Sequence, residues 1–139
     1  MGTAQKSLRI PSEVVKAIED LAEMSDQDFT TVAVELLTEA SKMRRCPGIV
    51  FADGPSGRRA RIAGTGLDVW EVVATYKSLD RDPTRLHEAY PWLSEAQLRA
   101  ALGYYVAYPD EIDRRIILNE RWTEEQLRAQ HPSLTVERR

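Results

Sequence analysis

The chain has 139 residues, enough for one ordinary domain or for two very small ones. Its content of 42% hydrophobic and 29% charged residues is normal for a globular protein in water. The formal net charge of −3 and the pI near 5.5 argue against a protein that coats nucleic acid non-specifically, but they leave room for a local basic patch.

Cysteine usage and hydropathy indicate the compartment. Cys46 is the single cysteine, so no internal disulfide can form and a reducing environment is expected. No apolar run approaches the length of a membrane span, and the N-terminal residues lack the apolar core of a signal peptide. These features predict a cytoplasmic protein without a membrane partner.

Residues 1–45 have the pattern of one short strand followed by two amphipathic helices. Residues 5–11 alternate in side-chain character and end at Pro11, which stops a strand. Apolar side chains then recur at helical spacing in two runs: Val14, Ile18, Leu21 and Ala22, then Ala33, Leu36, Leu37 and Ala40. Elements this short cannot bury their apolar faces alone, so we expect this segment to form a homodimer.

A strand that ends at proline and precedes two helices resembles the ribbon-helix-helix repressors. In that family two chains pair their strands into an antiparallel ribbon, which enters the major groove of DNA. The resemblance implies that Gln5, Ser7 and Arg9 point at base edges. It also implies that Thr30, near the start of the second helix, approaches the DNA backbone. Arginine pairs with guanine and glutamine with adenine, so these residue types suit base reading. The alternative is an arm that dimerises without touching DNA.

A β-hairpin is expected after a linker at residues 43–48, where proline and glycine follow the end of a helix. Apolar residues 49–52 and 60–62 flank the run Asp53-Gly54-Pro55-Ser56-Gly57. Asp-Gly between apolar runs is a hairpin signal, and Pro55 predicts a loop longer than a tight turn.

Three helices are predicted between the hairpin and Tyr108. Their start signals are two capping boxes and one N-cap followed by proline: Asp68 with Glu71, Ser94 with Gln97, and Asp82 with Pro83. The second and third helices, joined across residues 90–93, form a plausible helix-turn-helix. Arg99 is the only basic residue of the third helix, which makes that helix a poor DNA reader and a better protein-packing surface.

Arg58, Arg59 and Arg61 lie at the tip and on the returning strand of the expected hairpin. A hairpin beside a helix-turn-helix has the arrangement of a wing, and wing arginines commonly bind phosphate. We therefore predict that these three arginines contact DNA. The alternative is a solvated charged edge that discourages aggregation between strands.

The middle of the chain carries a second resemblance. Gly64-Thr65, a short helix, Tyr90-Pro91-Trp92-Leu93-Ser94 and Ala100-Ala101-Leu102 resemble a bacterial family of small trihelical domains. That family was long labelled as of unknown function and is found in antitoxins of VapB type. The resemblance covers roughly the middle half of the chain. It implies an antitoxin role, with a partner that resembles a PIN-type ribonuclease whose active site is a cluster of metal-binding carboxylates.

The last part of the chain is rich in arginine and contains an aromatic anchor. Arginine and tryptophan are common at the centre of protein interfaces, so we predict toxin contacts at Arg114, Arg115, Arg121, Trp122 and Arg128. An arginine among the toxin's carboxylates would block the metal. A capping box at Thr123 and Gln126 predicts a separate helix, and residues 127–135 echo residues 86–94. The alternatives are a solvated terminus and two helices stopped alike by proline.

The sequence offers little support for an enzyme. Its two histidines, His87 and His131, each lie at or just before an expected helix end, where packing is the commoner role. Motifs for a Ser-His-Asp triad, an H-E-x-x-H site, a phosphate-binding loop or a paired-cysteine metal site are absent. We therefore expect no catalytic residues, no metal, no cofactor and no small-molecule substrate.

These patterns predict a mainly α protein in three segments. A ribbon-helix-helix-like strand and two helices occupy 1–45, a β-hairpin with a trihelical, winged helix-turn-helix-like domain occupies 46–120, and a C-terminal helix and tail occupy 121–139. The predicted function is an antitoxin of a type II toxin–antitoxin pair that neutralises its cognate ribonuclease toxin and represses its own operon by binding operator DNA as a homodimer. The alternatives are a dimeric protein-interaction module and a stand-alone transcription repressor without a toxin.

Overall fold

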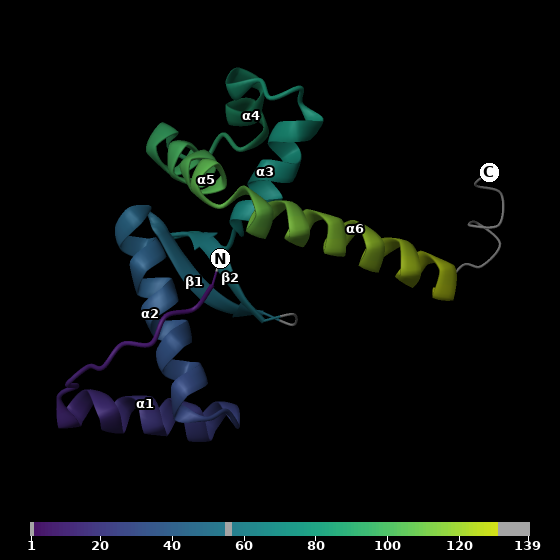
Figure 1. The fold of residues 1–139 in the computed structure, drawn as a ribbon. Helices are drawn as coiled ribbons and strands as arrows, with labels where there is room; N and C mark the ends of the chain where they lie inside the picture. The colour runs from purple at the N-terminus through teal and green to yellow at the C-terminus, as the bar shows by residue number, and fades with distance from the viewer. Residues whose placement is uncertain (1, 55–56, 131–139) are drawn as a thin grey trace. The chain divides into compact units, whose positions relative to one another are not determined.

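The computed structural model describes residues 2–54 and 57–130 (Figure 1). The chain forms two compact units, of which the first ends at Arg44 and the second begins at Arg45. Six helices and one two-stranded antiparallel hairpin are present among the described residues, so the mainly α class is confirmed. None of those helices has both the length and the apolar character that crossing a membrane requires.

The N-terminal unit consists of an extended segment and two helices, α1 (Ser12–Ser25) and α2 (Phe29–Arg45). Residues 2–11 belong to no helix or strand in the single chain. Asp28 accepts a hydrogen bond from the Thr31 backbone N–H at 2.7 Å, which begins α2 and lowers the pKa of the Asp28 carboxyl. The core is small and comprises Ile18, Ala22 and Val32, with Phe29 and Ala33 packed against it. Strand pairing by residues 5–10 requires a second chain and stays a prediction.

The C-terminal unit begins with the expected hairpin. Strands β1 (Ile49–Gly54) and β2 (Gly57–Ile62) pair antiparallel, from Ile49 opposite Ile62 to Gly54 opposite Gly57 (Figure 1). The predicted longer loop is wrong, because the paired strands leave only residues 55 and 56 between them. Gly57 has a φ of 107°, which a side chain would strain, and this lets the ladder continue to the end of the hairpin.

The three middle helices begin where the sequence predicts. They are α3 (Val69–Ser78), α4 (Pro83–Ala89) and α5 (Glu95–Ala107). Both capping boxes are present, and the Asp82 side chain accepts from the Thr84 N–H at 2.9 Å. The helices pack with the hairpin around one core of buried residues: Ile49, Ala60, Ile62, Val69, Val72, Val73, Leu86, Leu93, Leu98, Ala101, Tyr104 and Ile112.

The residues of the Gly-Thr and Tyr-Pro-x-Leu-Ser motifs hold turns in this unit. Gly64 adopts a φ of 77°, and the Thr65 hydroxyl donates to the Ile62 carbonyl at 2.8 Å, which closes the turn between β2 and α3. The Tyr90 hydroxyl shares a hydrogen bond of 2.9 Å with the Thr75 hydroxyl, and Leu93 is buried. These motif residues therefore build the fold.

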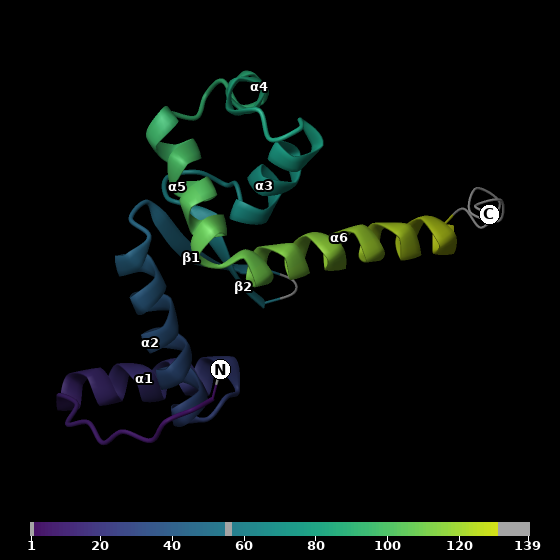
Figure 2. The same ribbon diagram turned by 45° about the horizontal axis from the view of Figure 1, so that its top comes forward.

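The last helix, α6 (Pro109–Gln130), is continuous. The predicted helix start at Thr123 is wrong, because the Thr123 hydroxyl donates to the Asn119 carbonyl inside α6. The first turns of α6 lie against α3 and α5, whereas its second half projects away from the rest of this unit (Figures 1 and 2). The echo at residues 127–135 extends past residue 130, outside the described residues.

One polar cluster ties α3, α5 and α6 together. Asp113 of α6 accepts hydrogen bonds of 2.7 Å from Lys77 Nζ of α3 and from the Tyr105 hydroxyl of α5. Lys77 and Tyr105 lower the pKa of Asp113, and Asp113 in turn raises the pKa of Lys77. The projecting helix is thus fixed at its base by a charged group as well as by the buried Ile112.

Replacing Asp113 with asparagine is expected to lower the free energy of unfolding at neutral pH, because the charged acceptor is lost. The lowered pKa of Asp113 means that its contribution is complete above the ordinary carboxyl pKa and is lost as the pH falls through the lowered value. Urea titrations should therefore separate the two proteins near neutrality and bring them together in acid. Asp110→Asn, an exposed site on the same helix, is the control. An undiminished difference in acid would contradict this assignment.

Candidate functional site

The extended segment exposes the predicted base-reading residues. Gln5, Ser7 and Arg9 are all exposed, and Leu8 between them is 65% exposed. Thr30 is exposed in the first turn of α2, beside the N–H that Asp28 already occupies. The N-terminal unit therefore presents these side chains to solvent, although the Asp28 carboxylate already occupies the Thr31 N–H at the start of α2.

The N-terminal unit also leaves much apolar surface uncovered. Its exposed large apolar side chains come from the extended segment and from both helices: Leu8, Val14, Leu21, Met24, Val34, Leu36 and Leu37. Only three residues form the buried core of this unit. A core of this size contributes little stability, so the unit gains most by burying the exposed side chains against a partner.

Asp68 is a buried carboxylate held by two arginines of β2. Its side chain is 6% exposed, and Arg59 Nε lies 2.7 Å from Oδ2 while Arg61 Nε donates to Oδ1 at 3.1 Å. The Arg59 contact is an ion pair without hydrogen-bond geometry. The Trp70 indole N–H also donates to Asp68, at 3.2 Å. This cluster joins the hairpin to the start of α3.

The predicted DNA-binding arginines of the hairpin thus have different surroundings. Arg59 and Arg61 point to the same face of β2, as alternate residues of a strand do, and both contact Asp68. Arg58 lies on the other face and pairs with the exposed Asp53 at 3.2 Å. Sequence reasoning missed the structural task of Arg59 and Arg61. The sequence signal that could have revealed this task is two arginines at alternate strand positions followed by an acidic residue just after the Gly-Thr turn.

A groove of about 410 Å³ runs between the hairpin and α6. It brings together Arg58 and Arg59, which the sequence assigned to DNA, and Arg114 and Arg115, which it assigned to the toxin. The remaining lining residues are apolar apart from one acid: Phe51, Ala60, Trp70, Glu111, Ile112 and Leu118. We call this feature the arginine groove. It concentrates positive charge on a chain whose net charge is negative.

The projecting half of α6 carries the other predicted toxin-binding residues. Trp122 is 61% exposed, and Arg121 and Arg128 are exposed too. Among the described residues, Arg128 makes a 3.5 Å surface ion pair with Glu124, one turn earlier. Leu127 of this half is also exposed, as are Ile117 and Leu118 near the end of the first half. A helix exposed on all sides that keeps such residues is suited to binding another protein.

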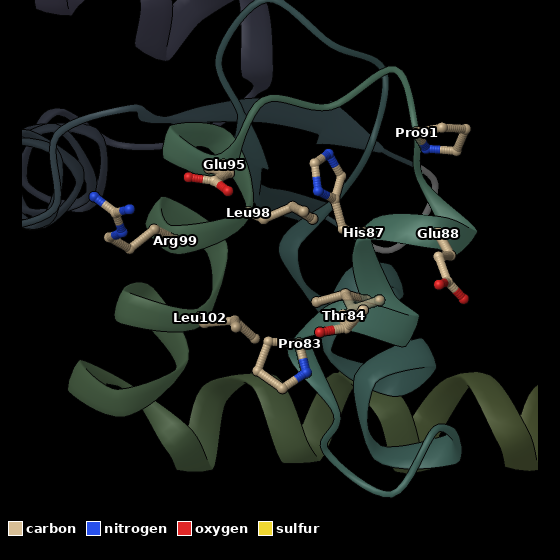
Figure 3. A pocket seen from close by; sticks show the side chains of 10 residues that line it. Pro83, Thr84, His87, Glu88, Pro91, Glu95, Leu98, Arg99 and Leu102 are labelled. Atoms are coloured by element: carbon tan, nitrogen blue, oxygen red, sulfur yellow. The ribbon is translucent and has the colours of Figure 1, made fainter.

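A second pocket, of about 800 Å³, lies between α4 and α5. Figure 3 shows Leu98 and Leu102 of α5 pointing toward His87 and Pro83 of α4, with Arg99 directed away. Sequence reasoning did not anticipate this pocket. Within the described part of the chain no group of three or more His, Cys, Asp or Glu is arranged to hold a metal ion.

Comparisons with known proteins identify one segment. Residues 49–105 match the model of a family described as "Protein of unknown function (DUF433)". The match includes the hairpin, α3, α4 and most of α5, and it excludes the N-terminal unit and α6. No curated protein and no solved structure matches the chain significantly. The resemblance of the middle segment to a family of unknown function is therefore confirmed, and the antitoxin role stays a prediction.

Replacing Asp68 with asparagine should lower the free energy of unfolding by about 2–4 kcal/mol, because two largely buried guanidinium groups lose their counter-charge. Asp53→Asn is the matched control. It removes the exposed partner of Arg58 and should cost at most about 1 kcal/mol. Urea titration of both variants measures the difference, and equal effects would show that the Asp68 cluster is not a structural centre.

Proposed function

We propose that the protein is the antitoxin of a type II toxin–antitoxin pair. In this proposal the N-terminal unit dimerises and reads operator DNA, and the projecting half of α6 binds a PIN-type ribonuclease toxin. The observation that carries the proposal is that both parts keep large apolar side chains exposed, at Leu8 in one and Trp122 in the other. The two parts lie outside the segment that matches the family of unknown function.

Dimerisation through residues 5–10 would complete the N-terminal unit. Side chains alternate across a strand, so a ribbon made of two copies would turn Leu8 and Ile10 to one face. That face would cover apolar side chains of α1 and α2 that are exposed in the single chain. Gln5, Ser7 and Arg9 would share the opposite face, and their chemistry suits hydrogen bonding to base edges in the major groove.

Toxin binding by α6 draws on its exposure and composition. A free helical end of this length is marginally stable by itself and gains from packing on a partner. Trp122 supplies a large apolar anchor, and Arg121 and Arg128 supply guanidinium groups that pair strongly with carboxylates. A toxin whose active site holds metal-binding carboxylates offers a complementary surface.

The competing function is a dimeric interaction module without a DNA target. Residues 1–45 favour it by charge, because they contain six Lys or Arg against eight Asp or Glu. A stand-alone repressor without a toxin is the other alternative. Co-purification of the tagged chain with the product of the neighbouring gene separates these functions. A stoichiometric small nuclease supports the antitoxin, whereas a lone dimer that binds upstream DNA supports the repressor.

Leu8→Asp and Arg9→Ala should separate assembly from DNA reading. The aspartate would place a charge in the apolar face of the ribbon, so both the dimer mass in solution and upstream-DNA binding should be lost. Arg9→Ala should keep the dimer and toxin binding but abolish operator binding. Lys16→Ala, an exposed cation on α1, is the control and should change neither. DNA binding that survives Leu8→Asp would exclude the ribbon.

Trp122→Ala should weaken toxin binding by about 2 kcal/mol or more, the range of an aromatic hot spot. Trp92→Ala is the matched control, because Trp92 is 67% exposed in the same unit but lies on the turn between α4 and α5. Calorimetric titration of toxin into each variant measures the change. Equal losses for the two tryptophans, or none for Trp122, would remove α6 from the toxin interface.

A further inference from the structure

The lining of the arginine groove includes no residue of the N-terminal unit, and it does not include Arg121, Trp122 or Arg128. We propose that the groove binds the phosphate backbone of DNA, as a contact additional to that made by the N-terminal ribbon. This inference rests on the DNA-binding part of the proposed function and deepens it. The sequence assigned Arg114 and Arg115 to toxin binding. This inference assigns them to DNA instead, in one anion site with Arg58 and Arg59.

The charges around the groove favour an anionic ligand. Four arginines line it, whereas Glu111 is the only acid among the lining residues. The Tyr104 hydroxyl donates a hydrogen bond to Glu111, and burial raises the pKa of Tyr104, which keeps that donor protonated. The nearby Asp113 is held by Lys77 and Tyr105. The neighbouring acids are thus engaged by the protein's own donors, and the groove keeps a positive balance.

The ion-pair partner of each hairpin arginine determines how readily that arginine can contact a phosphate. Arg58 pairs with Asp53, whose side chain is 88% exposed, and such a surface pair is weak enough to exchange for a phosphate. Arg59 is fixed by buried Asp68, so its position is preorganised and its charge partly neutralised. Arg58 of β2 and Arg114 and Arg115 of α6 are thus the contacts that a phosphate would engage, and Arg59 is a fixed positive background.

The shape of the groove favours a phosphodiester strand over an acidic protein surface. Its lining comes mainly from β2 and α6, with one residue each from β1 and α3, and it includes the buried Ala60 and Ile112. Guanidinium groups on two walls can contact one backbone from both sides, and their planar forks match phosphate oxygens. Trp122, the exposed aromatic anchor that suits a protein partner, is not among the lining residues.

The test is the salt dependence of DNA binding by the full chain. Labelled upstream duplex is titrated by fluorescence anisotropy at several salt concentrations with wild type, Arg114→Gln/Arg115→Gln and Arg121→Gln/Arg128→Gln. The slope of log K against log salt is negative, and each lost phosphate contact lowers its magnitude by about 0.9. The first variant should lose about 2 in slope per protomer and weaken binding to all sequences alike. The second, with two arginines beyond the groove on α6, should keep the wild-type slope.

Two further variants keep the outcomes separate. Arg58→Gln removes a cation of β2 from the groove and should also lower the magnitude of the salt slope. It tests the groove even if the double variant fails to fold. Arg9→Ala should abolish selective operator binding, and the weak sequence-independent binding that remains should keep the slope contributed by the groove, so failure of base reading and failure of the groove give different results. An unchanged slope in both groove variants, with operator binding intact, overturns the groove. Loss of toxin binding in place of the slope change assigns the groove to the protein partner and overturns it too.

Discussion

A buried carboxylate is the constraint on which the C-terminal unit depends. The Asp68 carboxylate is removed from water, and burying its charge would be costly without a counter-charge. Arg59 and Arg61 provide that counter-charge from alternate positions of one strand. The Gly64-Thr65 turn brings Asp68 back beside Arg61, where the two residues form a bridge. The same charge cluster therefore ties the hairpin to the start of α3. It also fixes Arg59, which lines the arginine groove.

Much of the local structure could be predicted because its causes are local. The starts of α3, α4 and α5 follow from capping residues within three positions of each helix, and the hairpin follows from turn residues between short apolar runs. What escaped prediction depends on contacts distant in sequence. The pairing of Arg59 with Asp68, the groove between β2 and α6, and the pocket beside His87 appear only when the elements pack. The expected break at Thr123 failed because a capping pattern also occurs inside helices.

The residues that carry the family resemblance explain fold more directly than function. Thr65 and Tyr90 make hydrogen bonds inside the C-terminal unit, and Leu93 is buried in its core. A match over residues 49–105 thus identifies a scaffold, and a scaffold supports different functions. The parts of this chain outside the match are chiefly the N-terminal unit and α6. Function is best sought in those parts and where α6 meets the scaffold.

The acidity of the chain is consistent with DNA binding when charge is considered by location. A protein with net charge −3 gains little from non-specific attraction to DNA, so binding at physiological salt needs cations concentrated at defined contacts. The arginine groove provides such a concentration, and in the proposed function Arg9 would provide a contact that depends on the base. Neither contact needs to be strong alone, because two linked contacts raise the effective concentration at each other's site. A repressor built in this way would bind non-specific DNA weakly and its operator selectively, since only the operator satisfies both contacts.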